Sequence, residues 1–278
     1  GSTFETIDVG LPIESDDITF RPIDIQVGPD GAVYVADMCE EFIAHGQHFQ
    51  GQIDPDSGRV YRLRAETDSA ANSSSISNLD DLATDQLVDT LAHPDKWFRQ
   101  TALRLIADRQ DKSIVPRLQK LVNEKTGDEA REAFWALNVL GELDDKLALE
   151  TLAHSNWAIR CWTVRLLGDR AIVSQPLAEA LADRAAKEPN VEVRAQLACT
   201  ARRLPGDSAL PILKSLLAHD EDAGDPFIPL LLWWALETQT SANLDAVIAL
   251  FDDAQFWQSR LVADTITNRM SRRLASSG

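Results

Sequence analysis

Two histidines and one aspartate near the N-terminus are the residues of this sequence whose types best suit metal coordination. His45 and His48 are separated by two residues, and Asp37 lies a short distance before them. Imidazole nitrogens and carboxylate oxygens are ligands for several divalent cations. The pattern therefore predicts a metal-binding or substrate-contacting loop over residues 37–48. A His-x-x-His spacing outside a helix has low specificity, and the alternative is a polar loop that caps the neighbouring β structure.

A pair of adjacent tryptophans is the second candidate. Trp233 and Trp234 fall in the most apolar stretch of a predicted helix, where consecutive side chains point about 100° apart. Both indoles cannot face one core equally, so we predict that one of them lies in a groove and contacts a partner. The chain has seven tryptophans, which also allow a surface on which sugars stack. Packing in the core is the simplest interpretation for most of them.

The remaining composition argues against several classes of function. The formal net charge is −17, and a field of that sign repels phosphate backbones, so no nucleic-acid partner is predicted. The three cysteines lie at least 38 residues apart, which leaves no zinc ribbon, CxxC redox centre or CxxCH haem attachment. No apolar run is long enough to span a bilayer. We find no phosphate loop, nucleophile elbow or paired carboxylates, and therefore predict no catalytic residue and no cofactor.

A polar linker divides the sequence into two parts. Residues 67–78 are small and mostly polar, without a hydrophobic period, which is typical of a linker. Residues 1–66 contain short stretches with strand-like alternation, which predicts a β-rich segment. Its expected strands cover 22–27, 32–36 and 59–63, with a turn at 28–31. Three short strands are too few for a stable independent sheet, so the segment is expected to belong to a larger β structure.

Residues 79–278 contain a repeated helical pattern. Apolar residues recur at helical spacing, and a short element recurs with an acidic or amide residue four positions before an arginine. Arg160 lies 61 residues after Arg99, and Arg194 lies 95 residues after it. Both offsets are multiples of roughly 31 residues, the length of one helical hairpin. The sequence therefore predicts a mainly α fold, an α-α superhelix of about six helical hairpins behind the β-rich segment.

The repeated element resembles the HEAT family. Its three clearest copies pair Asp95 with Arg99, Asn156 with Arg160, and Asn190 with Arg194. The Asp or Asn is expected to cap the helix that follows, and the Arg is expected to bridge to a neighbouring repeat while its stem packs. A single hairpin cannot bury its own apolar face, so stacking of the repeats supplies the core.

The N-terminal segment carries a wider resemblance. Residues 20–38 and 58–63 resemble the last blade of a β-propeller of the soluble sugar-dehydrogenase type. With the helical repeats behind them they resemble the PVC-type haem family of membrane-bound dehydrogenases, large exported proteins in which HEAT repeats follow a propeller. The resemblance implies a fragment of such a protein and an exported location, periplasmic or at the cell surface. Because most of the propeller and the haem motif are absent from this sequence, the resemblance assigns neither dehydrogenase activity nor haem binding to it.

These observations favour a non-catalytic scaffold or protein-interaction module of a larger exported multidomain protein. Its expected partner is another protein or a neighbouring domain of the same chain. One alternative is a fragment of a propeller-type sugar or alcohol dehydrogenase, to which residues 37–48 contribute a site loop. A second alternative is a carbohydrate-binding surface. The sequence leaves open the identity of the partner, the reaction of the parent protein, the oligomeric state and whether the β-rich segment is ordered alone.

Overall fold

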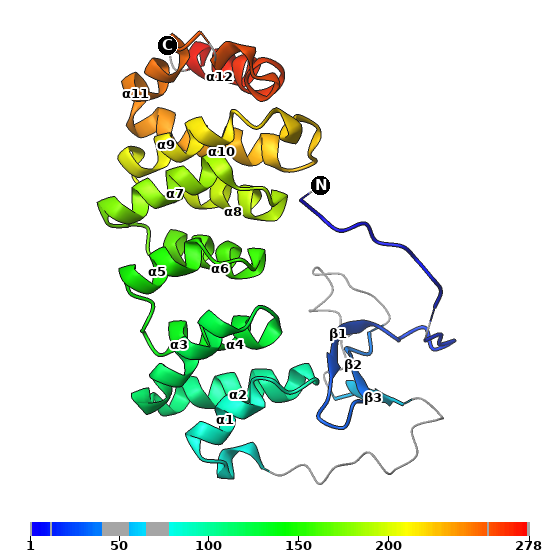
Figure 1. The fold of residues 1–278 in the computed structure, drawn as a ribbon. Helices are drawn as coiled ribbons and strands as arrows, with labels where there is room; N and C mark the ends of the chain where they lie inside the picture. Colours follow the sequence, from blue (N-terminus) through cyan, green and yellow to red (C-terminus); the bar gives the residue numbers. More distant parts are fainter. Residues whose placement is uncertain (1, 12, 41–55, 65–77, 255, 277–278) are drawn as a thin grey trace. The chain divides into compact units, whose positions relative to one another are not determined.

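The computed structural model describes residues 2–11, 13–40, 56–64, 78–254 and 256–276 (Figure 1). Within these ranges a short three-stranded sheet is followed by twelve α-helices, α1 to α12, among which α1 packs on α2, α5 on α6 and α9 on α10 (Figure 1). The predicted fold class, a mainly α superhelix of HEAT-like hairpins behind a short β-rich segment, is thereby confirmed. The predicted linker lies outside the described residues apart from Asn78, so the domain boundaries stay predictions.

The sheet consists of β1 (Pro22–Val27), β2 (Val33–Asp37) and β3 (Arg59–Leu63). β2 lies in the centre and pairs antiparallel with both neighbours. Gly31 has a φ of +73°, which glycine adopts without strain, and its N–H donates to the carbonyl of Gly28 in the turn between β1 and β2. Each strand lies within one residue of its predicted position.

The chain divides into two compact units. The first unit contains the sheet, α1 (Thr84–Thr90), α2 (Lys96–Arg109), α3 (Val115–Glu124) and most of α4 (Asp128–Val139). Its helical core is made of apolar residues at helical spacing, all fully buried. They include Leu87, Leu91, Ile106, Leu118 and Phe134.

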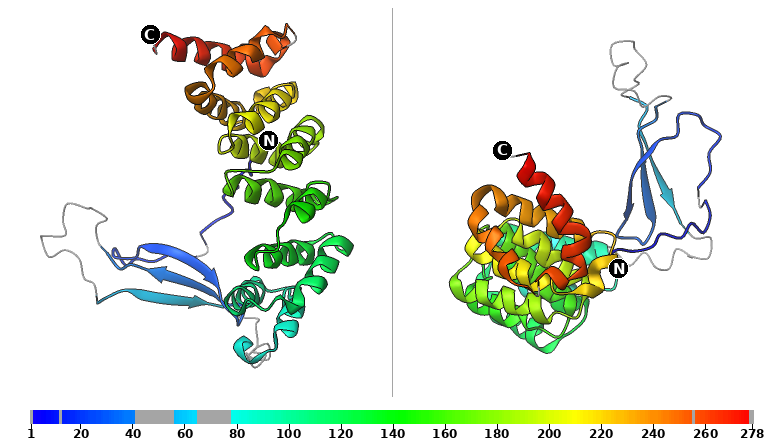
Figure 2. Two further views of the ribbon diagram at one scale, coloured as in Figure 1. Left: turned by 90° about the vertical axis from the view of Figure 1, so that its left-hand side faces the viewer. Right: turned by 90° about the horizontal axis from the view of Figure 1, so that it is seen from above.

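The second unit contains the later helices, shown from two further sides in Figure 2. They are α5 (Asp145–Leu152), α6 (Trp157–Asp169), α7 (Gln175–Lys187), α8 (Val191–Ala201), α9 (Gly206–Leu216), α10 (Ile228–Ala242), α11 (Leu244–Ala249) and α12 (Thr267–Ala275). A single π-helical turn, Leu261–Ile266, leads directly into α12.

These helices form two layers. The even-numbered α6, α8 and α10 pack on one another in one layer, and the odd-numbered α5, α7 and α9 pack in the other. Gly168 allows α6 and α8 to approach closely, since a Cβ there would lie 2.8 Å from Oγ1 of Thr200. The core of the unit therefore lies between the two layers. The side of each layer that faces away from the core is open to solvent or a partner.

The predicted helix caps are present. Asp95, Asn156 and Asn190 each accept a hydrogen bond from the backbone N–H two residues further on, at 2.8, 2.9 and 3.0 Å. Each satisfies an amide that would otherwise lack a partner in the first turn of α2, α6 or α8.

Candidate functional site

Three arginines occupy the same position in their repeats and make the same kind of contact. Arg99, Arg160 and Arg194 lie in the first turn of α2, α6 and α8, four residues after the cap. One side of each guanidinium donates to backbone carbonyls of the turn before its own helix, and the other side binds a carboxylate 28 or 33 residues further on. We call these three ion pairs the arginine ladder.

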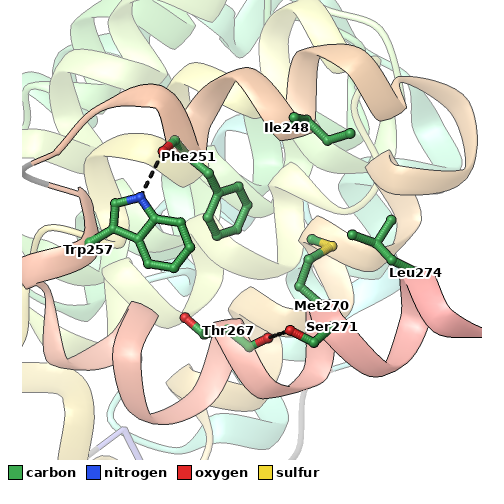
Figure 3. Close-up of a pocket in the computed structure, with 7 residues that line it drawn as sticks. All are labelled: Ile248, Phe251, Trp257, Thr267, Met270, Ser271 and Leu274. Atoms are coloured by element: carbon green, nitrogen blue, oxygen red, sulfur yellow. Dashed lines mark hydrogen bonds between the residues drawn. The ribbon is translucent and has the colours of Figure 1, made fainter.

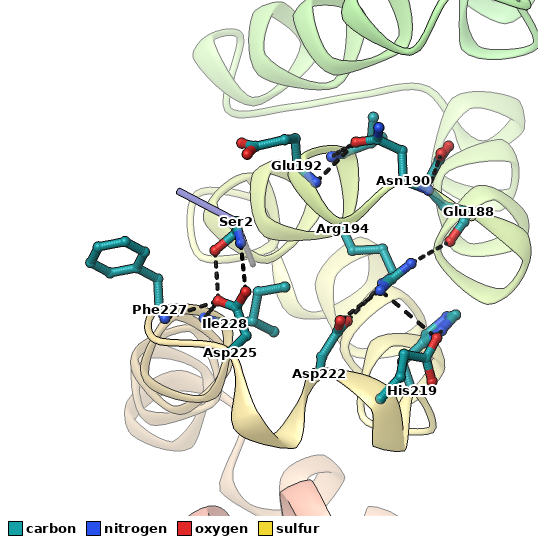
Figure 4. A network of polar contacts seen from close by, with 12 residues as sticks. Ser2, Glu188, Asn190, Glu192, Arg194, His219, Asp222, Asp225, Phe227 and Ile228 are labelled. Atoms are coloured by element: carbon teal, nitrogen blue, oxygen red, sulfur yellow. Dashed lines mark hydrogen bonds and ion pairs between the residues drawn. The ribbon is translucent and has the colours of Figure 1, made fainter. Parts of the chain in front are cut away.

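Arg194 contacts both oxygens of one carboxylate (Figure 4). Its Nε and Nη2 each donate to one oxygen of Asp222 at 2.6 Å, and its Nη1 donates to the carbonyl of Glu188 at 2.9 Å. The side chains of Arg194 and Asp222 are both buried. The hydrogen bond to Asp222 raises the pKa of Arg194 above its ordinary value, although burial acts in the opposite direction. Arg194 therefore stays charged inside the protein.

Arg160 repeats this geometry with Glu188. Its Nε and Nη2 donate to the two carboxylate oxygens at 2.8 and 2.5 Å, and its Nη1 donates to the carbonyl of His154 at 2.8 Å. One oxygen of Glu188 also accepts from the N–H of Asn190 at 3.0 Å. Glu188 therefore connects the ion pair of one repeat to the cap of the next.

In the first unit, Arg99 donates through Nε to Glu132 at 3.2 Å and through Nη1 to the carbonyls of His93 and Pro94, both at 2.8 Å. An arginine stays protonated at any physiological pH, so none of these three pairs can transfer a proton. The ladder is a structural element that fixes successive repeats to each other. Sequence reasoning found its arginines but missed the carboxylates of Glu132, Glu188 and Asp222.

Two histidines before the ladder helices also have structural roles. Nδ1 of His93 accepts from the N–H of Asp95, and Nδ1 of His154 accepts from the N–H of Asn156, both at 3.0 Å. An accepting Nδ1 requires the neutral ring with its proton on Nε2. In the third copy Glu188 takes the same place with a carboxylate oxygen. These side chains complete the turn and the cap before each helix.

The two adjacent tryptophans of α10 lie in different environments. Trp233 is 6% exposed, whereas Trp234 is 43% exposed, as expected for neighbouring helical positions. On α6, the guanidinium of Arg165 lies 5.1 Å from the centre of the Trp162 ring, within the range of a cation–π interaction. The even-numbered layer therefore presents aromatic side chains outside the core. Contact of Trp233 or Trp234 with a partner stays a prediction.

The predicted metal site is only partly described. His45 and His48 lie outside the described residues. Asp37 is buried and accepts from the N–H of Arg21 at 2.7 Å and from Nε of Arg59 at 2.8 Å. Burial acts to raise the pKa of Asp37, but these hydrogen bonds outweigh it and hold the pKa below its usual range. Within the described part of the chain, no group of three or more potential ligands could hold a metal ion.

Two cavities flank α12 in the second unit. One is apolar, about 250 Å³ in volume, and is shown in Figure 3. The other, about 370 Å³, has three arginines of α12 in its wall. Sequence reasoning did not single out these arginines, although a run of basic residues at the end of a strongly acidic chain is a feature that could have identified them.

Two family models match separate stretches of the chain. Residues 84–155 match the model for HEAT repeats, and residues 12–67 match a domain of unknown function (DUF7133). No curated protein matches the chain. None of the described helices combines the length and the apolar character needed to cross a membrane. The helical part is thus a HEAT-like solenoid, a fold that generally mediates protein interaction.

Proposed function

We propose that this chain is a non-catalytic scaffold that binds another protein, or a neighbouring domain, through the exposed side of helices α6, α8 and α10. HEAT repeats stack into extended surfaces that suit such binding. The arginine ladder supports the proposal, since buried ion pairs with several hydrogen bonds fix the register between repeats. A surface that is already rigid loses little conformational entropy when a partner binds.

The exposed indole of Trp234 is the observation that carries this proposal. Its helix, α10, packs against α8 and α9 and begins just after Asp225, which accepts from the N–H groups of Phe227 and Ile228 at 2.9 and 3.0 Å. The helix that holds the indole is therefore fixed at its start and along its length. A large aromatic side chain held in this way is the residue type that dominates the binding energy of protein interfaces.

Site-specific photocrosslinking tests the proposal. A benzoylphenylalanine at position 234 is expected to give a discrete adduct in extracts of the organism that makes the protein. The matched control is the same probe at position 149, since Leu149 is also partly exposed but lies in the odd-numbered layer, on α5. Adducts of equal yield at both positions, or none at position 234, would contradict the proposal.

We propose in addition that the sheet belongs to a larger β structure, the terminal blade of a propeller in an exported protein. The exposure of β1 supports this, because Ile23, Ile25 and Val27 are all solvent-exposed on a strand at the edge of the sheet. Apolar side chains on an edge strand are usually covered by a neighbouring element. Fractionation of the source cells tests the location. The dehydrogenase and carbohydrate alternatives stay predictions.

A further inference from the structure

Helix α12 separates an apolar cavity from a basic one. The apolar cavity is lined on the α12 side by Met270 and Leu274 and on the other side by Ile248, Phe251 and Trp257 (Figure 3). The indole N–H of Trp257 donates to the carbonyl of Phe251 at 2.8 Å, and the two rings lie 5.4 Å apart. One wall of this cavity is therefore held in place. The volume of the cavity is below the range of about 300–1,000 Å³ that is usual for small-molecule sites. The cavity therefore suits side chains of a peptide better than a free cofactor.

The basic cavity lies on the other side of α12. It is lined by Arg269, Arg272 and Arg273 together with Trp233 and Glu237. The side chains of Arg269 and Arg272 are exposed, and neither forms an ion pair or a hydrogen bond with any residue that the structure describes. The ladder arginines of this unit, in contrast, are buried and paired.

The net charge of the C-terminal residues 259–278 has the opposite sign to that of the whole chain. Residues 259–278 contain four arginines and one aspartate, a balance of +3, whereas the chain as a whole carries −17. A local patch of one sign attracts a partner of the other sign and repels partners of its own sign. A guanidinium also matches a carboxylate in geometry, since two parallel N–H groups can donate to its two oxygens.

We propose that the two cavities around α12 together bind an acidic segment of another protein, with an apolar side chain in the cavity beside Trp257 and carboxylates on Arg269 and Arg272. This inference rests on the proposed scaffold function and names the chemistry of the partner. The apolar cavity alone would accept many sequences, and the arginines on the other side of α12 select those with negative charge. A short acidic segment can lie on this local patch alone, whereas a nucleic acid would extend its phosphates over the acidic remainder of the chain, which repels them.

Fluorescence anisotropy with a defined probe tests this site. The probe is a labelled peptide with two leucines one helical turn apart between glutamates, and two matched peptides carry glutamine for glutamate or alanine for leucine. We expect saturable binding of the first peptide, weaker at high salt because ions screen the arginine–carboxylate attraction. The double variant R269E/R272E is expected to lose roughly tenfold or more in affinity. Leu274→Asp tests the apolar cavity and is expected to weaken binding to a similar extent.

Lys146→Glu is the charge control, because it reverses one charge, a change of −2 against −4 for the double variant, at an exposed position on α5 that forms no ion pair with the described residues. Equal affinity of R269E/R272E and the unchanged protein would overturn the proposal, as would equal binding of the three peptides. Self-association that the same charge reversals abolish would show that a second copy occupies the site, which also overturns it. If adducts at position 234 persist while the peptide does not bind, the site at α12 is wrong and the scaffold function stands.

Discussion

Removal of one arginine of the ladder is the sharpest test of what holds the repeats together. In the variant Arg194→Ala, Asp222 loses two hydrogen bonds of 2.6 Å and its countercharge, and the carbonyl of Glu188 loses a donor at 2.9 Å. The Asp222 side chain is only 4% exposed, so water cannot fully replace these bonds. The variant leaves a negative charge without a partner inside the protein.

The expected loss of stability is large. Breaking a buried ion pair by removing one partner costs about 3–5 kcal/mol of unfolding free energy. At a urea dependence of about 2 kcal/mol per molar, that loss lowers the unfolding midpoint by roughly 2 M. The double replacement Arg194→Met with Asp222→Leu removes both charges and keeps apolar volume, so it should cost much less than the sum of the single changes.

Urea unfolding followed by far-UV circular dichroism measures these differences, and hydrogen exchange of the α8 amides locates them. Arg203→Ala is the control, since Arg203 pairs with Asp169 at the surface and both side chains are about half exposed. Such a pair contributes about 0–1 kcal/mol. If Arg194→Ala costs no more than Arg203→Ala, the ladder does not fix the register of the repeats and the reasoning is refuted.

Three further changes test local features of the second unit. Asn156→Ala removes the cap of α6 and should cost about 1 kcal/mol in urea unfolding, whereas Asn156→Asp keeps the cap and loses only the hydrogen bond from Nδ2 to the carbonyl of Thr126. Gly168→Ala places a methyl group 2.8 Å from Oγ1 of Thr200 and should cost about 1–3 kcal/mol, with partial recovery in the double variant that also carries Thr200→Ala. Burial raises the pKa of the Cys161 thiol to about 11, so iodoacetamide at pH 8 should label it slowly in the folded protein and much faster in urea. Equal labelling rates in the two states would contradict that last expectation.

The parts of the fold that depend on local sequence could be predicted. A capping Asp or Asn accepts a hydrogen bond from an amide only two residues away. The start of α2, α6 and α8 could therefore be predicted from the sequence at Asp95, Asn156 and Asn190. The turn at Gly31 is equally local, because only its own φ is involved. The rest of the solenoid could be predicted from the sequence repeat. A pattern that recurs at a fixed interval predicts stacked helical hairpins, even when the contacts between them are unknown.

The partners of the ladder arginines could not be predicted in the same way. Glu188 and Asp222 both lie 28 residues after their arginines, but Glu132 lies 33 residues after Arg99. The interval varies with the length of the turns between helices, and a chain with 44 acidic residues offers many carboxylates at a similar distance. Which of them is buried depends on how the helices pack.

The use of arginine changes along the second unit. In α6 and α8 the arginine after the cap is buried on a carboxylate, and its charge is fully compensated within the fold. Before α10, Asp225 accepts from the first amides, and the residue four positions after it is Pro229, which has no charge to contribute. Helix α12 carries the exposed arginines Arg269 and Arg272 instead. A paired and buried arginine contributes to stability but is not available to a ligand, whereas an exposed and unpaired one contributes little to folding. Arg269 and Arg272, which are exposed and form no ion pair with the described residues, are therefore the two arginines of α12 on which the proposed recognition of an acidic partner rests.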